Sequence, residues 1–350
     1  MTIDIARLRR QLLAWYDQEG HTLPWRIRPE DRIAGGPVAD PYAIWLSEIM
    51  LQQTTVPHAT PYWHRFLSLW PTVQDLAVAP RDDVLREWAG LGYYARARNL
   101  HACAIEVATD HDGQFPDTLD GLRSLPGIGD YTANAILAAA FDKPASVVDG
   151  NVERVITRLH RVETAMPKAK PEVRKLAAAI ADPDRSGDYA QAIMDLGATV
   201  CTPRKPDCSA CCWSFACAAS AVGDMERYPV KAPRKVKPVR RGTAWLVRRA
   251  GRIWLRKRGD AGLLGGMTEV PSSPWLETGH ASEAPPLEAE WADRGEVRHV
   301  FTHFELRLAV REGEASPGWE PDSGYWADER DLGNEALPSV MRKVLAARRS

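Results

Sequence analysis

The feature that most limits the possible folds is a basic, proline-containing stretch that separates two different hydrophobic patterns. Between Lys231 and Arg258 the sequence has twelve Lys or Arg and no acidic residue, with Pro233 and Pro238 inside. Proline removes a backbone donor and like charges keep a chain extended, so we expect a linker here. Helical spacing of apolar residues dominates before this stretch and alternating segments follow it. The sequence therefore predicts two different domains.

The composition fits two ordinary globular domains. With 45% hydrophobic and 26% charged residues, the chain is unlike a disordered or fibrous protein. The predicted parts are a helical domain at 1–227, a basic linker at 228–242 and a second domain at 243–350. Thr243–Val247 and Ile253–Arg258, joined around Gly251, are predicted to form a β-hairpin. We expect a surface loop over Pro271–Glu290 and a last helix over Leu337–Arg349.

Charge and hydropathy say little about partners. The formal net charge is −1, which still permits nucleic-acid binding because a binding face needs only local charge. No apolar run reaches the length of a membrane span, and Met1–Arg10 lacks the uncharged core of a signal peptide. We therefore expect a cytoplasmic protein that does not contact a membrane.

Four closely spaced cysteines predict a metal centre. Their spacing is C-x6-C-x2-C-x5-C, and the candidate ligands are Cys201, Cys208, Cys211 and Cys217. In a reducing compartment such crowding favours metal over disulfides. Thiolates suit either zinc or an iron–sulfur cluster, so ligand type alone leaves both open, and free buried cysteines are the third alternative. Cys103 and Cys212 lie outside this spacing and are expected only to pack.

A glycine-rich turn joins two predicted helices, Asp117–Leu125 and Thr132–Phe141. Gly127 and Gly129 in LPGIG permit positive φ and leave no side chain in the way. Backbone N–H groups at the start of the next helix can then approach a DNA phosphate. The turn alone fits a plain connection between packed helices equally well.

Two carboxylates stand out by their context. Glu48 lies in PYAIWLSEIMLQQT, whose apolar residues have helical spacing and whose environment would raise a carboxyl pKa, as a general acid requires. Most glutamates on such helices, however, simply face water. Asp149 lies in SVVDGNVERVITRL just before a predicted helix, where a structural N-cap is the ordinary interpretation.

In this order, the motifs resemble those of MutY-type adenine DNA glycosylases in the endonuclease III (helix–hairpin–helix) superfamily. LPGIGDYTANAI resembles the helix–hairpin–helix, WLSEIMLQQT and VDGNVERV resemble its catalytic segments, and the cysteine spacing resembles its [4Fe–4S] loop. The resemblance covers nearly the whole chain and is weakest at Pro271–Glu290 and in the last helix. It implies an all-α glycosylase domain with one [4Fe–4S] cluster, in which Gly127 and Gly129 bind the DNA backbone.

The resemblance also implies a reaction. A monomer would excise adenine mispaired with 8-oxoguanine or guanine from double-stranded DNA. Glu48 would protonate the base and Asp149 would stabilise the cationic sugar, which are the two roles that glycosidic cleavage requires; Asn151 would support them. Tyr131 occupies the position of the nucleophilic lysine of bifunctional relatives. Because a phenol forms no Schiff base, the expected enzyme is monofunctional, with Tyr131 hydrogen-bonded in the active site.

Further binding roles come from the same resemblance. Arg26 in LPWR and Gln191 in YAQAIMDLGATVC match positions near the adenine pocket. Gln53 and Tyr93 match residues that wedge into the DNA stack, and an aromatic ring can stack on any base. For Tyr93 a half-buried core position is the alternative. The chain has extra residues at 27–40, where it departs from the family pattern.

The C-terminal part resembles a Nudix fold without its chemistry. GLLGGMTEVP is similar to the opening of that fold, but no glutamate-rich magnesium-binding helix follows. We therefore expect a Nudix-like α+β domain that recognises the lesion. VRHVFTHFELRL is predicted to be a strand, and its Phe301, Thr302 and His303 resemble the loop that reads 8-oxoguanine. Thr302 replaces the usual serine and keeps the hydroxyl.

The sequence leaves two alternative functions, both less favoured. A bifunctional pyrimidine glycosylase/lyase is disfavoured by Tyr131 and by the second domain. A non-enzymatic, DNA-binding iron–sulfur protein is disfavoured because Glu48 and Asp149 are both present.

Overall fold

The computed structural model describes residues 3–28, 31, 39–233, 236–259, 262–278 and 284–347. Its internal contacts form two compact units. The first unit comprises Met1–Ala77 and Ala102–Pro233, and the second comprises Val78–His101 and Arg234–Ser350. Most of the extra residues at 27–40 lie outside the described part. None of the described helices is long and apolar enough to cross a membrane.

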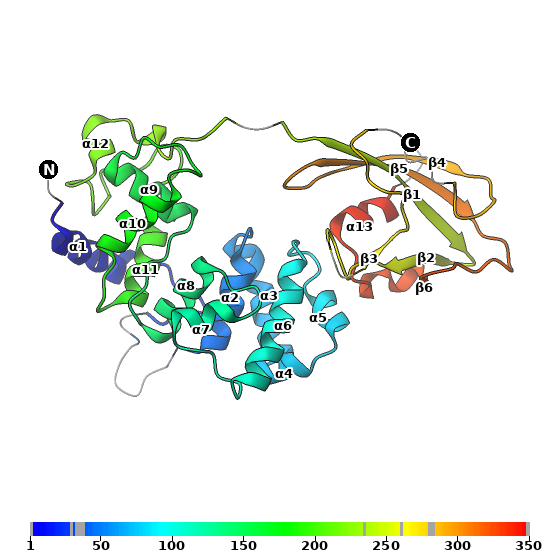
Figure 1. The fold of residues 1–350 in the computed structure, drawn as a ribbon, viewed down its shortest axis with the longest axis horizontal. Helices are drawn as coiled ribbons and strands as arrows, with labels where there is room; N and C mark the ends of the chain where they lie inside the picture. Colours follow the sequence, from blue (N-terminus) through cyan, green and yellow to red (C-terminus); the bar gives the residue numbers. More distant parts are fainter. Residues whose placement is uncertain are drawn as a thin grey trace. The chain divides into compact units, whose positions relative to one another are not determined.

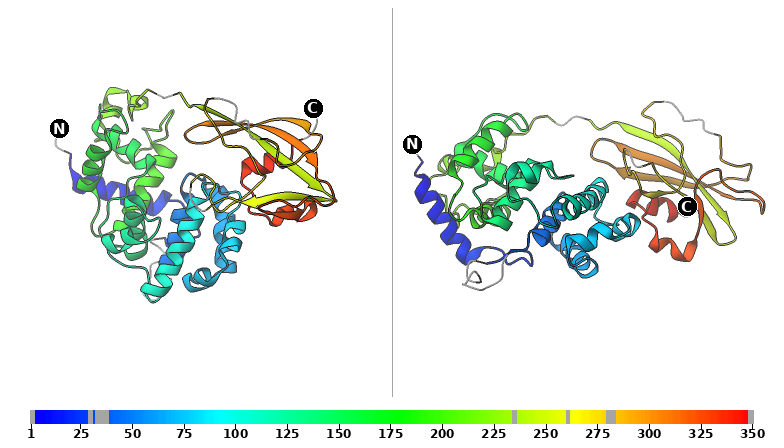
Figure 2. Two further views of the ribbon diagram at one scale, coloured as in Figure 1. Left: turned by 45° about the vertical axis from the view of Figure 1, so that its right-hand side comes forward. Right: turned by 60° about the horizontal axis from the view of Figure 1, so that its bottom comes forward.

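The first unit is built from helices (Figures 1 and 2). They are α1 (Ile5–Glu19), α2 (Pro41–Leu51), α3 (Val56–Leu69), α4 (Val73–Val78), α6 (Ala95–Asp110), α7 (Leu119–Ser124), α8 (Asp130–Phe141), α9 (Gly150–His160), α10 (Lys170–Ile180), α11 (Ser186–Asp195) and α12 (Ala218–Val222), of which α4 and α6 cross the unit boundary. One core cluster of this unit joins apolar faces of α1, α9, α10 and α11 to Trp213.

Local sequence signals set where the helices around the later site begin. Asp40 caps α2 by accepting from the Tyr42 N–H at 3.0 Å, and Pro41 suits the first turn because its missing donor is not needed there. Asp149 caps α9, so the structural interpretation of that residue is correct. Helix α11 continues into a π-helical turn, Leu196–Val200, which leads directly to Cys201. Such turns are frequent at functional sites.

The glycine-rich turn between α7 and α8 uses its two glycines differently. Gly127 has a φ of 76°, which favours glycine. Gly129 has a φ of −92° and is the N-cap of α8, so only Gly127 uses the positive φ that glycine permits. A Cβ at Gly129 would meet nothing within 4 Å. The approach to the α8 N-terminus is therefore open, as backbone contact with a phosphate requires.

The second unit is a mixed sheet with helices. Its elements are α5 (Arg81–Glu87), β1 (Val239–Arg249), β2 (Arg252–Lys257), β3 (Thr268–Glu269), β4 (Ala292–Val300), β5 (Glu305–Glu314), β6 (Tyr325–Asp328) and α13 (Ser339–Leu345). The strand order is β3-β2-β1-β5-β4, and β6 pairs with β2. β1 runs parallel to β5 and antiparallel to β2. The predicted hairpin is confirmed, with Ala250 and Gly251 at φ values of 48° and 76° in its turn.

Both faces of this sheet are covered by apolar side chains. On one face α13 packs against the strands in a core that includes Leu246, Leu308 and Met341, all fully buried (Figure 1). A second cluster groups Val247 and Trp254 with several partly buried tryptophans. A helix on an antiparallel-rich sheet is an α+β arrangement, so the predicted fold class is confirmed.

Two segments differ from their sequence-based descriptions. VRHVFTHFELRL is not one strand but the end of β4, a turn at 301–304 and the start of β5. In the predicted loop Pro271–Glu290, residues 279–283 lie outside the described part. The described remainder pairs with β1 at Ser272 and Leu276 and buries Leu287, so it is more than a surface loop.

Candidate active site

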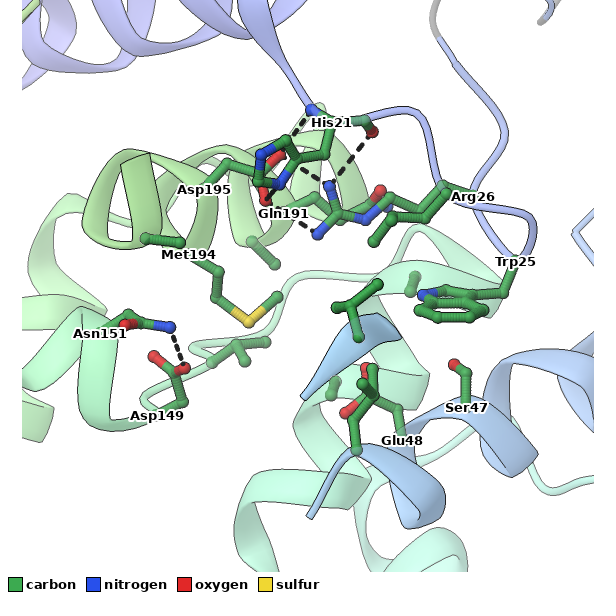
Figure 3. Close-up of a pocket in the computed structure, with 18 of the residues that line it drawn as sticks. His21, Trp25, Arg26, Ser47, Glu48, Asp149, Asn151, Gln191, Met194 and Asp195 are labelled. Atoms are coloured by element: carbon green, nitrogen blue, oxygen red, sulfur yellow. Dashed lines mark hydrogen bonds and ion pairs between the residues drawn. The ribbon is translucent and has the colours of Figure 1, made fainter. Parts of the chain in front are cut away.

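A cavity of about 440 Å³ in the first unit, here called the central cavity, collects most of the predicted catalytic and base-binding residues. It lies between α2, α8, the start of α9 and α11, and this volume suits a small organic ligand. The predicted residues among its lining are Arg26, Glu48, Gln53, Tyr131, Asp149, Asn151 and Gln191. Figure 3 shows Glu48, Asp149 and Arg26 around it, each from a different segment.

Glu48 lies on α2 among buried apolar neighbours, including Trp45 and Ile49. Burial raises the pKa of Glu48 from 4.5 to about 7. A hydrogen bond from Tyr131 and the charge of Arg26 lower this pKa in part, while Asp149 raises it. The carboxyl thus carries a proton over much of the neutral range and can act as a general acid.

Tyr131 is the second residue of α8 and lies beside Glu48. Burial and the nearby carboxylates raise the pKa of its phenol well above 10, so the group is neutral and donates. Its hydroxyl also lies 3.6 Å from the Met194 sulfur. The phenol can orient Glu48 but cannot act as an amine nucleophile.

Asp149 is held by two hydrogen bonds. Oδ1 accepts from the Val152 N–H at 2.7 Å, and Oδ2 accepts from Asn151 Nδ2 at 2.9 Å. Burial raises the pKa of Asp149, and these two hydrogen bonds oppose that shift. Helix cap and candidate catalytic carboxylate are therefore the same group, and the cap fixes where both oxygens lie.

A buried arginine joins this position to the cysteine loop. The Arg154 guanidinium donates to Asn151 Oδ1 at 2.9 Å and to the Gly197 carbonyl at 2.6 Å, and its Nε donates to the Cys201 carbonyl at 2.7 Å. Since Asn151 in turn donates to Asp149, a continuous polar chain runs from the loop to the cavity.

Arg26 is positioned by a residue that the sequence analysis missed. Its Nη1 and Nη2 donate to the two Asp195 oxygens at 2.7 and 3.0 Å, which is a bidentate pair (Figure 3). Asp195 also accepts from the His21 N–H at 2.9 Å. It follows Gln191 by one helical turn, so helical spacing from Gln191 was the signal that could have identified it.

The four predicted metal ligands line a second, smaller cavity. Cys201, Cys208, Cys211 and Cys217 all border it, whereas the excluded Cys103 and Cys212 do not. Burial, with a smaller contribution from its three partner thiols, raises the pKa of Cys211 to about 11. Bound iron or zinc would offset that cost, because metals bind thiolates. The donor set therefore fits a thiolate-bound centre, although among the described residues no three ligand side chains converge on a single-ion site.

The two predicted DNA wedges share a strained backbone. Gln53, in the turn after α2, and Tyr93, before α6, have φ values of 59° and 48°. Left-handed non-glycine residues cost energy and cluster at functional positions. The Tyr93 side chain is 52% exposed, so it lies at the surface and is not part of the core.

The predicted lesion-reading residues form the turn between β4 and β5. Phe301 packs against Phe304 with ring centroids 4.9 Å apart, while Thr302 and His303 are exposed. Within the second unit, the Thr302 hydroxyl lies 3.0 Å from the Tyr93 hydroxyl, in hydrogen-bonding range. The structure thus brings a predicted wedge and a predicted reader together.

The Nudix-like segment has no hydrolase site in the described residues. Glu269, from GLLGGMTEVP, is 2% exposed and paired with Arg256 at 2.7 Å and with Arg258. The described residues between β3 and β4 contain no helix. A glutamate neutralised by two arginines, without a following acidic helix, does not provide a magnesium site.

Comparisons with known proteins agree with this architecture. Residues 46–182 match the HhH-GPD superfamily base excision DNA repair protein family, and residues 243–347 match the NUDIX domain. The Homo sapiens adenine DNA glycosylase is 34% identical over 404 residues, covering 97% of this chain and 74% of that protein. The Rattus norvegicus adenine DNA glycosylase is 35% identical, with coverage of 97% and 78%.

A solved structure supports the first unit. A thermostable thymine-DNA glycosylase has a TM-score of 0.55 and 28% identity, covering 62% of this chain and 97% of its own. Together, the relatives that match 97% of this chain, the two matched domains and the central cavity lead to one assignment. The chain belongs to the adenine DNA glycosylases of base excision repair, enzymes that hydrolyse N-glycosyl bonds.

Proposed function

We propose that the enzyme removes adenine mispaired with 8-oxoguanine or guanine and leaves the DNA strand uncut. The observation that carries this proposal is the pairing of two unlike carboxyls in the central cavity. Glu48 has a pKa of about 7, and Asp149 is held at a helix N-terminus. An acid and an ionised partner are what glycosidic cleavage uses. The adenine reaches them by flipping out of the duplex.

In the proposed reaction Glu48 donates its proton to N7 of the flipped adenine. Protonation makes the base a better leaving group, so the bond between the base and the deoxyribose weakens. Arg26 and Gln191 line the same cavity and bind the base. The bidentate contact of Arg26 with Asp195 keeps that guanidinium at a fixed position.

Asp149 then stabilises the positive charge that develops on the sugar. Its oxygens are oriented before the reaction by the Val152 N–H and the Asn151 amide, so little reorganisation is needed. Water attacks the cationic carbon, and the Glu48 carboxylate accepts the proton of that water. Tyr131 orients Glu48 and forms no covalent bond with the sugar, so no lyase step follows.

Recognition of the opposite base is assigned to the second unit. Thr302 and His303 are exposed on the β4–β5 turn and provide hydrogen-bonding groups for 8-oxoguanine. Tyr93 and Gln53 enter the base stack, where an aromatic ring contacts any base. The basic stretch from Lys231 to Arg241 contributes phosphate contacts that salt weakens.

The four loop cysteines are proposed to hold one [4Fe–4S] cluster. Cys201, Cys208, Cys211 and Cys217, which line one small cavity, would hold the cluster through their thiolates, and the loop would be crosslinked when it is bound. Arg154 connects the Cys201 carbonyl to Asn151, so the geometry of this loop bears on the position of Asp149.

The test compares duplexes carrying adenine opposite 8-oxoguanine, adenine opposite guanine, or an oxidised pyrimidine. We expect free adenine from the first two and strand breaks only after alkali. Glu48→Gln should bind the same duplexes and release no adenine, because glutamine keeps the shape without the proton. Strand nicking without alkali, with borohydride trapping, would establish the bifunctional alternative. Binding without adenine release by the wild type would establish the non-enzymatic one.

A further inference from the structure

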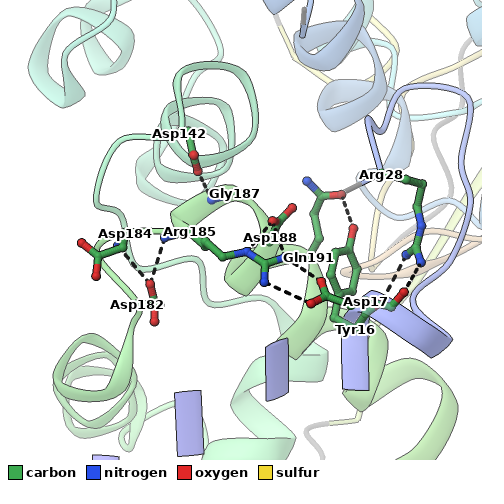
Figure 4. A network of polar contacts seen from close by, with 10 residues as sticks. All are labelled: Tyr16, Asp17, Arg28, Asp142, Asp182, Asp184, Arg185, Gly187, Asp188 and Gln191. Atoms are coloured by element: carbon green, nitrogen blue, oxygen red, sulfur yellow. Dashed lines mark hydrogen bonds and ion pairs between the residues drawn. The ribbon is translucent and has the colours of Figure 1, made fainter. Parts of the chain in front are cut away.

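A buried tyrosine outside the central cavity holds one of its lining residues from behind. Tyr16 on α1 is fully buried, and its hydroxyl donates to Oε1 of Gln191 at 2.9 Å (Figure 4). Gln191 on α11 is 5% exposed and borders the cavity, whereas Tyr16 does not. The carbonyl end of the Gln191 amide therefore points towards the protein core.

This contact selects one of the two orientations of the amide. If the amide were reversed, its NH₂ would donate to the phenol oxygen and the phenolic hydrogen would lack a partner. Among the described residues, Gln191 is the only acceptor that the Tyr16 hydroxyl meets. A buried donor without an acceptor is strongly unfavourable, so the reversed amide is disfavoured. Burial also raises the pKa of Tyr16, so the phenol keeps its proton and remains a donor.

Several contacts fix Tyr16 itself. The Arg28 guanidinium donates to the Tyr16 and Asp17 carbonyls, each at 3.2 Å, and lies over the Tyr16 ring at 5.1 Å. A Cβ at Gly20 would collide with this ring and with the guanidinium, so the close approach requires glycine.

The helices that carry the pair are also tied together. Arg185 donates to Asp17 of α1 at 2.6 Å and forms an ion pair with the buried Asp188 of α11 at 2.8 Å (Figure 4). Asp188 lies one helical turn before Gln191 in a region where the two helices pack. The spacing across the hydrogen bond from Tyr16 to Gln191 is therefore set by the fold and needs no bound ligand.

We propose that Tyr16 is a positioning residue for base specificity: it turns the NH₂ group of Gln191 into the cavity, where that group donates to a ring nitrogen of the flipped purine. This inference rests on the proposed function. Adenine has ring acceptors at N1, N3 and N7 that can receive such a bond. Since N7 is assigned to Glu48, the Gln191 amide pairs with N1 or N3.

The experiment combines a protein change with a substrate change. Single-turnover excision is measured opposite 8-oxoguanine for adenine and for its 1-deaza, 3-deaza and 7-deaza analogues, with wild type and Tyr16→Phe. Dividing the rates of the two proteins on each substrate cancels the intrinsic lability of each base. Replacing N1 or N3 by carbon should reduce the excision rate of the wild type by a factor about tenfold larger than for Tyr16→Phe. In that variant the Gln191 amide is no longer held by the Tyr16 hydroxyl and does not favour that nitrogen.

Tyr189→Phe is the matched control. Tyr189 lies on α11 two residues before Gln191, is 4% exposed and has no hydrogen-bond partner among the described residues. Removing the Tyr189 hydroxyl should change the excision rates of all four substrates by the same factor. If Tyr16→Phe does the same, Tyr16 is only structural and the inference fails.

A second variant keeps the test decisive if Tyr16→Phe folds poorly. Gln191→Met removes the amide and should abolish the 1-deaza or 3-deaza discrimination. Retained discrimination in Gln191→Met would overturn the inference. Absence of adenine release by the wild type would instead overturn the proposed function, so the two failures are distinguishable.

Discussion

The raised pKa of Glu48 makes a quantitative prediction about the pH dependence of excision. Only the protonated carboxyl can donate, so the single-turnover rate should fall as pH rises through about 7. With that pKa the acid fraction drops from about ten-elevenths at pH 6 to about one-eleventh at pH 8, a roughly tenfold loss. An ordinary glutamate would give about a hundredfold loss over the same interval. A straight log-rate line of slope −1 from pH 6 to pH 8 would refute the assignment.

Neighbours of Glu48 should shift this profile in a known direction. The Tyr131 hydrogen bond and the Arg26 charge both lower the Glu48 pKa. Tyr131→Phe should therefore move the inflection to higher pH, whatever it does to the maximal rate. An inflection that stays in place or moves lower would show that Tyr131 does not contact the acid.

The same shift predicts a change in stability that needs no substrate. The folded pKa of Glu48 lies above the reference value of 4.5, so its stabilising contribution is complete below pH 4.5 and is lost as pH rises through 7. A shift of this size corresponds to ~3 kcal/mol. In urea titrations, the unfolding free energy of Glu48→Gln minus that of the wild type should increase by up to that amount between pH 4.5 and pH 8, because only the wild type loses this contribution. Glu19→Gln, at an exposed position in α1, should show no such gain.

Three further predictions concern the other sites. Asp149→Asn should retain the helical fold by circular dichroism but lose about a hundredfold or more in single-turnover rate, because an amide stabilises a cationic sugar poorly; undiminished excision would leave residue 149 as a cap only. Purified protein should contain about four iron and four sulfide per chain, with Cys208→Ser losing them and Cys212→Ser unchanged; stoichiometric zinc without sulfide in anaerobic preparations would contradict the cluster. Thr302→Ala with His303→Ala should reduce the preference for 8-oxoguanine over guanine by about 1–3 kcal/mol per lost contact while excision survives; an unchanged rate ratio would place the lesion reader elsewhere.

Local sequence signals predicted the parts of the molecule that depend on neighbouring residues. The α2 helix around Glu48, the cap at Asp149 and the hairpin at Gly251 all follow from spacing and turn chemistry, and each is present. That the candidate residues line one cavity was expected only from the family resemblance. No periodicity in the sequence shows that α2 and α11 line the same cavity.

Tertiary contacts explain what the sequence analysis missed. Asp195 and Tyr16 are ordinary helix residues until the fold brings Arg26 and Gln191 to them. The turn at Phe301 was overlooked because apolar residues continue on both sides of it, and alternation alone does not distinguish one long strand from two paired ones. The pairing of residues 271–278 with β1 depends on strand contacts that are remote in sequence.

Because Asp149 is both the N-cap of α9 and a candidate catalytic carboxylate, folding and catalysis should tolerate different residues at this position. Serine, threonine and asparagine cap helices about as well as aspartate, so a library of position 149 selected only for thermal resistance should recover all four. Selection for survival under oxidative mutagenesis should retain aspartate alone, since it is the only member of that set that can carry a negative charge. The difference between the residue types recovered in the two selections would measure how much catalysis, in addition to helix capping, restricts the sequence at position 149.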